Sequence, residues 1–148
     1  MGRPILLSKA ALIEVNKLPD IEKYCDYYIY FLEIHLRQKM RGYVDQMLVI
    51  GDLTDLGARN FKLAVTKRNV GDSLKYGPER QHALIIVHAS TFAYTAWTFI
   101  KPLLPKKTLH KIEISGHNKK EIVEALSSRM DIKVIPEYLG GLNQTVDK

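Results

Sequence analysis

The chain has very little of what marks several large classes of protein. Its single cysteine, Cys25, cannot form an intramolecular disulfide, and it falls within a helical pattern, as expected for a packed thiol in a reducing compartment. No stretch approaches the roughly 18 apolar residues of a membrane-spanning helix. Residues 1–8 also lack the apolar core of a signal peptide. We therefore expect a cytoplasmic protein with at most peripheral membrane association.

The motifs of common enzymes and metal sites are missing as well. The chain contains no Gly-x-Ser-x-Gly turn, no phosphate-binding glycine loop, and no His-Glu-x-x-His or Cys-x-x-Cys pair. Asp52 and Asp55, near a predicted strand end, are better explained by turn and capping chemistry than as a catalytic carboxylate pair. The five histidines show no ligand spacing, and we expect His88 to bond locally or to line a pocket. We predict no catalysis, no cofactor and no metal.

The composition is that of an ordinary globular domain. The chain has 148 residues, of which 46% are hydrophobic and 26% charged, enough for one domain over residues 1–148 with a core of its own. The net charge of +6 comes from short, scattered basic clusters such as Lys106 and Lys107. These clusters usually solvate a surface, but they can also attract anionic lipid headgroups or nucleic acid. Because aromatics do not interleave with them and no known module appears, we do not expect a nucleic-acid partner.

The hydrophobic pattern predicts strands alternating with helices. Helical spacing indicates helices over residues 21–41, with Asp20 as N-cap, over 60–75 and over 118–129. Continuous apolar runs indicate buried strands over residues 47–50 and 83–87, with shorter strands near residues 2–7 and 111–115. This alternation predicts an α/β fold with a mostly parallel sheet covered by helices.

One helical segment, residues 92–104, is apolar around most of its circumference. Lys101 is its only charged residue, whereas a surface helix normally has one polar face. The segment is also too short to cross a bilayer. From the residues alone it is equally well explained as a central core helix, half of an oligomer interface, or a helix that contacts lipid.

Four short motifs follow one another between residues 76 and 141. They are Pro78-Glu79-Arg80; Trp97 with Ile100-Lys101-Pro102-Leu103-Leu104; Lys107-Thr108 with Lys111-Ile112; and Pro136-Glu137-Tyr138-Leu139-Gly140-Gly141. Their order and spacing resemble the CRAL-TRIO family, lipid-binding proteins that include phosphatidylinositol and phosphatidylcholine transfer proteins. Upstream, Gly2-Arg3-Pro4-Ile5 and residues 48–52 resemble the first and central strands of the family.

The resemblance implies a lobe whose sheet forms the floor of a lipid pocket and whose residues 92–104 form a mobile gate helix. The inner side of this helix would meet acyl chains and its outer side would meet bilayer, so neither side is expected to be polar. The gate and tail residues implied are Phe92, Trp97, Phe99, Ile100, Leu103 and Leu104. The implied function is to bind a single lipid, such as phosphatidylinositol, and to transfer or present it between membranes.

In family members that bind phosphatidylinositol, the headgroup lies near three positions that correspond to Glu79, Thr108 and Lys111. A lysine suits phosphate, a threonine hydroxyl can bond it, and a carboxylate can accept from inositol hydroxyls. The alternative is a structural ion pair between Glu79 and Lys111.

The sequence also departs from the family pattern. Around the strand at 83–87, four residues differ from those usual in the family: His82, Ala83, His88 and Ser90. In the loop after Asp52, Gly57 is displaced, so the sequence does not decide whether this loop lines the pocket. The helical module that precedes the Gly-Arg-Pro strand in the family is missing, so we expect a fragment or a minimal version.

The main rival is a protein-interaction module with the same fold and no exchangeable lipid, which docks a partner such as a small GTPase or dimerises through the Trp97 helix. A filled or collapsed pocket would favour that alternative. An open apolar cavity behind Trp97 would favour lipid transport.

Overall fold

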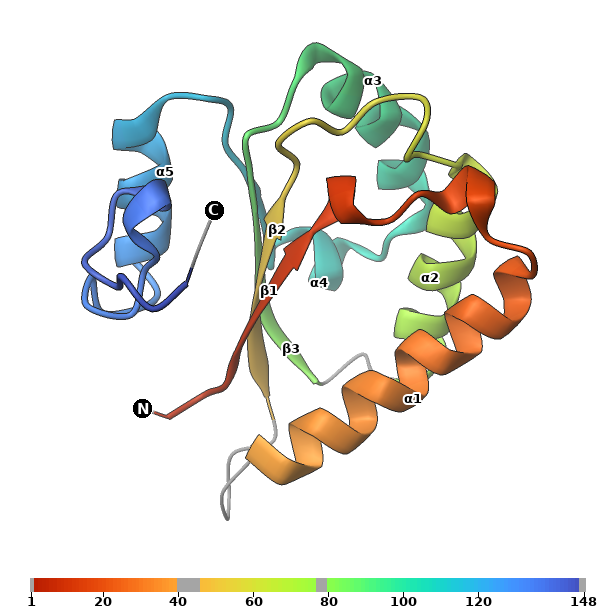
Figure 1. Ribbon diagram of the computed structural model, residues 1–148, viewed down its shortest axis with the longest axis horizontal. Coiled ribbons are helices and arrows are strands. Elements are labelled where there is room, and N and C mark those ends of the chain that lie inside the picture. Colours follow the sequence, from red (N-terminus) through yellow and green to blue (C-terminus); the bar gives the residue numbers. More distant parts are fainter. Residues whose placement is uncertain (1, 40–45, 77–79, 147–148) are drawn as a thin grey trace.

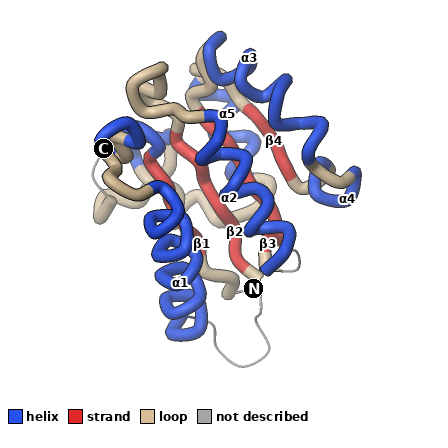
Figure 2. The backbone as a smooth tube through the Cα atoms, turned by 90° about the vertical axis from the view of Figure 1, so that its right-hand side faces the viewer, coloured by secondary structure: helices blue, strands red, loops and turns tan. Residues whose placement is uncertain are grey.

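The centre of the molecule is a four-stranded parallel sheet. We describe a computed structural model that covers residues 2–39, 46–76 and 80–146. The strands β1 (Ile5–Lys9), β2 (Met47–Asp52), β3 (Gln81–Val87) and β4 (Ile112–Ile114) lie side by side in chain order, as Figure 2 shows. Each neighbouring pair is parallel. The predicted α/β class with a parallel sheet is confirmed.

Helices fill the connections that parallel strands require. They are α1 (Ile21–Lys39), α2 (Leu63–Tyr76), α3 (Thr91–Ile100), α4 (Lys106–Leu109) and α5 (Lys119–Ser127), with short 3-10 turns η1 (Ala10–Leu12), η2 (Val15–Lys17), η3 (Lys101–Leu103) and η4 (Glu137–Leu139). As predicted, Asp20 caps α1, because its carboxylate accepts the backbone N–H of Lys23 at 3.0 Å.

The predicted helix over residues 60–75 begins three residues late, at Leu63. Asn60 is instead held in the preceding turn, where its side-chain oxygen accepts the N–H of Gly57 at 2.7 Å and its amide nitrogen donates to the carbonyl of Asp55 at 3.3 Å. An asparagine that satisfies turn backbone in this way does not start a helix. The predicted strand over residues 111–115 is likewise shorter, since only Ile112–Ile114 pairs with β3.

The two faces of the sheet are covered differently. In Figure 1, α5 and the C-terminal segment lie on one side of the sheet, and α1, α2, α3 and α4 lie on the other. On the α5 side, alternate strand residues pack against α5 and the segment after it in one closed cluster of Leu48, Ile50, Ile85, Val87, Ile122, Ala125, Leu126, Ile135 and Leu139. We call this side the packed face and the opposite side the cavity face.

Two glycines close the packed face at the C-terminal motif. Gly140 ends η4 in the left-handed region at φ 93°, where a Cβ would lie 2.3 Å from Val123. At Gly141 a Cβ would lie 2.1 Å from the carbonyl oxygen of Ile135. Only glycine fits either position, which gives the Gly140-Gly141 part of the motif a physical reason.

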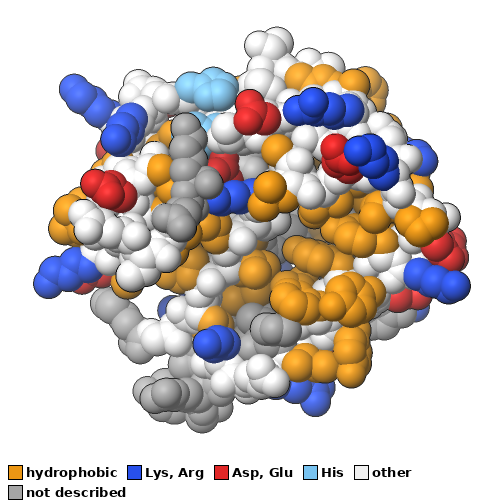
Figure 3. Space-filling model, in the orientation of Figure 1, with side chains coloured by type: hydrophobic (Ala, Val, Ile, Leu, Met, Phe, Trp, Pro, Cys, Tyr) orange, Lys and Arg blue, Asp and Glu red, His pale blue; other side chains and the backbone are white. Residues whose placement is uncertain are grey.

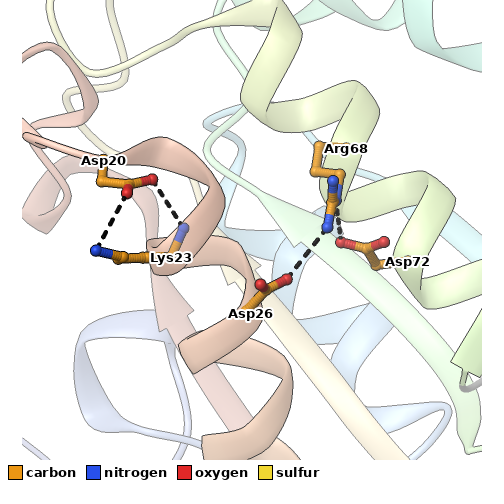
Figure 4. A network of polar contacts seen from close by, with 5 residues as sticks. All are labelled: Asp20, Lys23, Asp26, Arg68 and Asp72. Atoms are coloured by element: carbon orange, nitrogen blue, oxygen red, sulfur yellow. Dashed lines mark hydrogen bonds and ion pairs between the residues drawn. The ribbon is translucent and has the colours of Figure 1, made fainter.

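A polar network joins α1 to α2 above the cavity face. Arg68 on α2 contacts Asp72 one turn later at 2.7 Å and Asp26 on α1 at 3.1 Å, as Figure 4 shows. Asp26 and Arg68 are largely exposed, so we expect their contact to fix the position of α1 more than to add stability.

Candidate functional site

A cavity of about 440 Å³ lies between the cavity face of the sheet and helices α1 to α4. Its floor consists of strand residues that point away from the packed face: Leu6, Val49, Gly51, Leu84, Ile86, Ile112 and Ile114. Gly51 has no side chain, so the cavity extends to its backbone. A Cβ at this position would lie 3.7 Å from the side chain of Ile86, at ordinary van der Waals distance. Figure 3 shows hydrophobic side chains gathered in the middle and right of the face drawn there.

The helix α3 forms one wall of the cavity, and its two sides differ. Ser90 caps this helix by accepting the N–H of Ala93 at 3.3 Å. Of the six gate residues named from the sequence, Trp97, Ile100 and Leu104 line the cavity. The other three, Phe92, Phe99 and Leu103, are 38%, 59% and 43% exposed. The segment is therefore apolar on a side that faces the cavity and on a side that faces outward.

The beginning of α3 is joined to the segment before α2 by one aromatic contact. The rings of Phe61 and Phe92 meet edge to face, with centroids 5.4 Å apart.

Pro102 lies in the first turn of η3 and ends the helix beyond Ile100. Residues 92–104 are thus α3 followed by a tighter turn.

Two of the three predicted headgroup residues lie together at the end of the cavity where β3 and β4 begin. Thr108 and Lys111 both line the cavity, and the Thr108 carbonyl accepts the backbone N–H of Lys111 at 3.0 Å. The Lys111 ammonium donates to the carbonyl of Gln81 at 2.9 Å, which leaves further donors of this half-buried group for a ligand. Glu79 lies outside the described residues, so its predicted role and its alternative ion pair with Lys111 stay predictions.

The charges on the cavity walls have one sign. Lys62 and Lys111 line the cavity, and no aspartate or glutamate of the described residues does so. Burial raises the pKa of the wall tyrosines Tyr24 and Tyr28, which keeps both phenols neutral. The cavity is thus suited to a ligand with a long apolar part and an anionic or neutral polar end.

The walls from α1 and α2 were not recognised as site residues from the sequence. Tyr24, Tyr28 and Leu32 of α1, with Val65, Val70 and Leu74 of α2, line the cavity. Their spacing predicts an apolar helix face, but a face that meets a cavity has the same spacing as one that meets a core. The displaced Gly57 left it undecided in the sequence whether the loop after β2 lines the cavity. The loop does so through Leu53 and Leu56.

His88, one of the departures from the family pattern, lies with Asp52 in a different place, at the carboxyl ends of β2 and β3. The carboxylate of Asp52 accepts the N–H and the hydroxyl of Thr54 at 3.0 and 2.7 Å, and it lies 2.9 Å from Nδ1 of His88. Burial opposes ionisation of Asp52, but the hydrogen bonds from His88 and Thr54 leave its pKa lowered. Turn chemistry therefore explains Asp52, and His88 bonds locally, as predicted.

The remaining part of this polar cluster also lies outside the cavity. The His88 ring stacks on His117 with centroids 5.8 Å apart. Asp55, at φ 59°, is exposed, whereas Asp52 is buried. Within residues 2–39, 46–76 and 80–146, no three potential ligands come together to hold a metal ion.

A parallel sheet with an apolar cavity beside a wall helix that is apolar on two sides is the arrangement of a ligand-binding α/β protein. The chain matches the CRAL/TRIO domain family over residues 1–141, and it belongs to that family. No helix in the described part of the chain is both long and apolar enough to cross a membrane.

Comparison with curated proteins gives relatives that include phosphatidylinositol/phosphatidylcholine transfer proteins. The chain is 26% identical over 154 residues to Phosphatidylinositol/phosphatidylcholine transfer protein SFH12 of Arabidopsis thaliana, a match that covers 95% of the chain and 28% of that protein. It is 27% identical over 156 residues to Phosphatidylinositol/phosphatidylcholine transfer protein SFH11 of the same organism, which covers 95% of the chain and 40% of that protein. The chain thus spans well under half the length of these relatives.

Proposed function

We propose that this chain binds a single lipid in the cavity, a phospholipid such as phosphatidylinositol, and transfers or presents it between membranes. The observation that carries the proposal is the open apolar cavity behind Trp97. A protein-interaction module without exchangeable lipid would need no such cavity. The names of the two relatives, both phosphatidylinositol/phosphatidylcholine transfer proteins, support the same ligand class.

Because the cavity is small for a phospholipid, we expect the α3 wall to move during loading. A volume of about 440 Å³ lies in the lower half of the roughly 300–1,000 Å³ typical of pockets for drug-sized ligands. A phospholipid with two acyl chains is larger than such a ligand. When α3 opens, the outward-facing Phe99 and Leu103 would enter the bilayer. Their burial there would offset the free-energy cost of exposing the cavity side of α3 to water.

Charge supports an anionic headgroup at the Thr108 and Lys111 end. Lys111 is half-buried and already oriented by the Gln81 carbonyl, so it can meet a phosphate without losing much side-chain freedom. On the surface of α3, η3 and α4, the exposed Lys101, Lys106 and Lys107 lie next to the apolar Phe99 and Leu103 in the chain. Basic residues near exposed apolar ones favour contact with anionic membranes.

The test is binding of phosphatidylinositol and of diacylglycerol, a neutral lipid without phosphate, to Lys111→Ala. Hydrogen bonds to charged groups contribute about 1.5–3 kcal/mol, so phosphatidylinositol binding should weaken about tenfold or more, and diacylglycerol binding by less. Lys106→Ala is the matched control, because Lys106 is exposed and does not line the cavity. Equal losses for both lipids would mark Lys111 as a structural residue.

A further inference from the structure

The cavity has the volume of a single acyl chain. With α3 forming its wall, the cavity measures about 440 Å³. An engineered protein cavity of about 150 Å³ holds one benzene molecule, which has six carbon atoms. The present cavity is about three times larger, so it has room for about eighteen carbon atoms. That number corresponds to one long acyl chain, whereas a phospholipid with two such chains carries twice as many.

The length of the cavity leads to the same result. Along α2 its lining runs from Lys62, just before the helix, to Leu74, near the end of the helix. These residues lie twelve positions apart (74 − 62), which corresponds to about 18 Å along a helix axis. An acyl chain that reaches the middle of a bilayer is about 15 Å long, half of the hydrocarbon thickness. One extended chain therefore occupies the cavity from end to end.

The two ends of the cavity suit the two ends of such a lipid. Beyond Leu74 the chain passes from α2 to β3, whose first residue, Gln81, binds the half-buried ammonium of Lys111. This end can hold an anionic head. At the opposite end Phe61 lines the cavity, and the exposed Lys62 can keep its ammonium in water while its stem borders the cavity. That end suits the tip of an apolar chain.

The packing of α3 sets this narrow width. Ala93 and Ala96 line the cavity from α3 and are only 7% and 8% exposed. Because alanine is small, the backbone of α3 lies close to the space that the ligand occupies. The edge-to-face contact of Phe92 with Phe61 joins the beginning of α3 to the segment before α2. Room for a second acyl chain would require α3 to leave this position.

We propose that the preferred ligand of this cavity is a lipid with one acyl chain and an anionic head, such as a lysophospholipid, which is a phospholipid without its second chain. The inference rests on the proposed lipid-binding function and names the class of lipid. A second chain without room in the cavity would remain in water, and each methylene group so exposed lowers the binding constant about fourfold. A single chain is enclosed with α3 in place, so α3 moves only for its entry and release.

The experiment offers one-chain and two-chain lipids from the same membrane. Wild-type protein stripped of lipid is incubated with dioleoylphosphatidylcholine vesicles that contain equal amounts of oleoyl-lysophosphatidylinositol, dioleoylphosphatidylinositol and oleic acid. The protein is then separated from the vesicles, and its bound lipids are quantified by mass spectrometry. All four lipids carry the same acyl chain, so they differ only in the number of chains and in the head.

We expect one single-chain lipid per protein molecule and, relative to the vesicle composition, at least a tenfold excess over phosphatidylinositol and phosphatidylcholine. Enrichment of lysophosphatidylinositol identifies a phosphate head, and enrichment of oleic acid identifies a carboxylate head. Equal or preferred uptake of either two-chain lipid, or two single-chain lipids per protein, would overturn the inference and leave the proposed function standing. Uptake of no lipid at all would overturn both.

A second measurement tests where the chain lies. Ala93 follows Phe92 at the Phe61 end of the cavity, so Ala93→Leu should fill part of that end and shorten the preferred acyl chain by about three carbon atoms, the number that leucine adds. A series of lysophospholipids of increasing chain length measures the optimum. The control is Ala64→Leu, on the exposed side of α2 and outside the cavity lining. An unchanged optimum in folded Ala93→Leu protein would contradict this placement of the chain.

Discussion

The two faces of the sheet are both apolar, yet only one of them is filled. On the packed face, Ile85, Val87 and Leu126 are at most 1% exposed and belong to one continuous cluster. On the cavity face, Leu84 and Ile86 of the same strand are only half-buried and border open space. Adjacent residues of β3 thus differ in role: one set stabilises the fold and the other leaves room for a ligand.

This difference implies that the two faces of the sheet contribute unequally to stability. Close-packed side chains gain dispersion contacts, and a side chain that borders a cavity forgoes part of them. The core cluster on the packed face contains residues of α5 and the C-terminal segment and none of α3, so we expect that α3 can move without loss of this core.

The largest effect is expected from Ile85→Ala, compared with its neighbour Ile86→Ala. Ile85 is closely packed, so its truncation should lower the free energy of unfolding by about 2–5 kcal/mol. Ile86 already borders the cavity, and its truncation should cost less than half as much. Urea denaturation of both variants measures the difference. Equal losses would mean that the cavity is filled in solution.

The next effect concerns the two sides of α3. Trp97→Asp places a carboxylate on the cavity wall and should weaken lipid loading about thirtyfold or more, because a charge in an apolar site has no partner. Phe99→Asp, on the exposed side, should load normally but transfer lipid to vesicles more slowly. Normal loading of a folded Trp97→Asp protein would contradict the assignment of α3 as the wall that contacts the lipid.

A smaller effect is expected at Gly51, where the cavity floor has no side chain. Gly51→Ala should raise the free energy of unfolding by about 0.5–1 kcal/mol, because alanine loses less backbone entropy in a strand and the space for its Cβ is free. Gly51→Met should instead fill the cavity and reduce lipid uptake. Thermal unfolding together with loading of a fluorescent lipid checks both variants, and destabilisation by alanine would show that the floor is already close-packed.

The smallest effect is a pH dependence at the carboxyl end of the packed face. The pKa of Asp52 is lowered in the folded state, so its contribution to stability is present above the unfolded pKa of about 3.9 and is lost as pH falls through the lower folded value. Asp52→Asn should therefore lose less stability than wild type between pH 5 and about pH 3. Parallel acid unfolding curves for the two proteins would be inconsistent with this role.

The sequence predicted the fold better than the site. Buried strands such as β2 stand out because both of their faces are apolar, and Asp20 marks the start of α1 by its capping chemistry. The same apolar pattern cannot distinguish a wall of a cavity from a core, which is why Tyr28 and Leu32 were not predicted as site residues.

The resemblance to the CRAL-TRIO family supplied what the pattern could not. It singled out Trp97, Ile100 and Leu104, which line the cavity, together with Phe92, Phe99 and Leu103, which face outward. It also predicted Thr108 and Lys111, which the structure places at one end of the cavity. Glu79, the third residue that it predicted, lies outside the described residues.

The most direct test of the central claim is to extract purified, folded protein with organic solvent and to identify the bound lipids by mass spectrometry against the total lipids of the host. The account predicts one enriched lipid class in near-stoichiometric amount in wild type, and its loss in Trp97→Asp. No lipid in wild type, even after incubation with liposomes, would contradict a lipid carrier and favour a protein-interaction module.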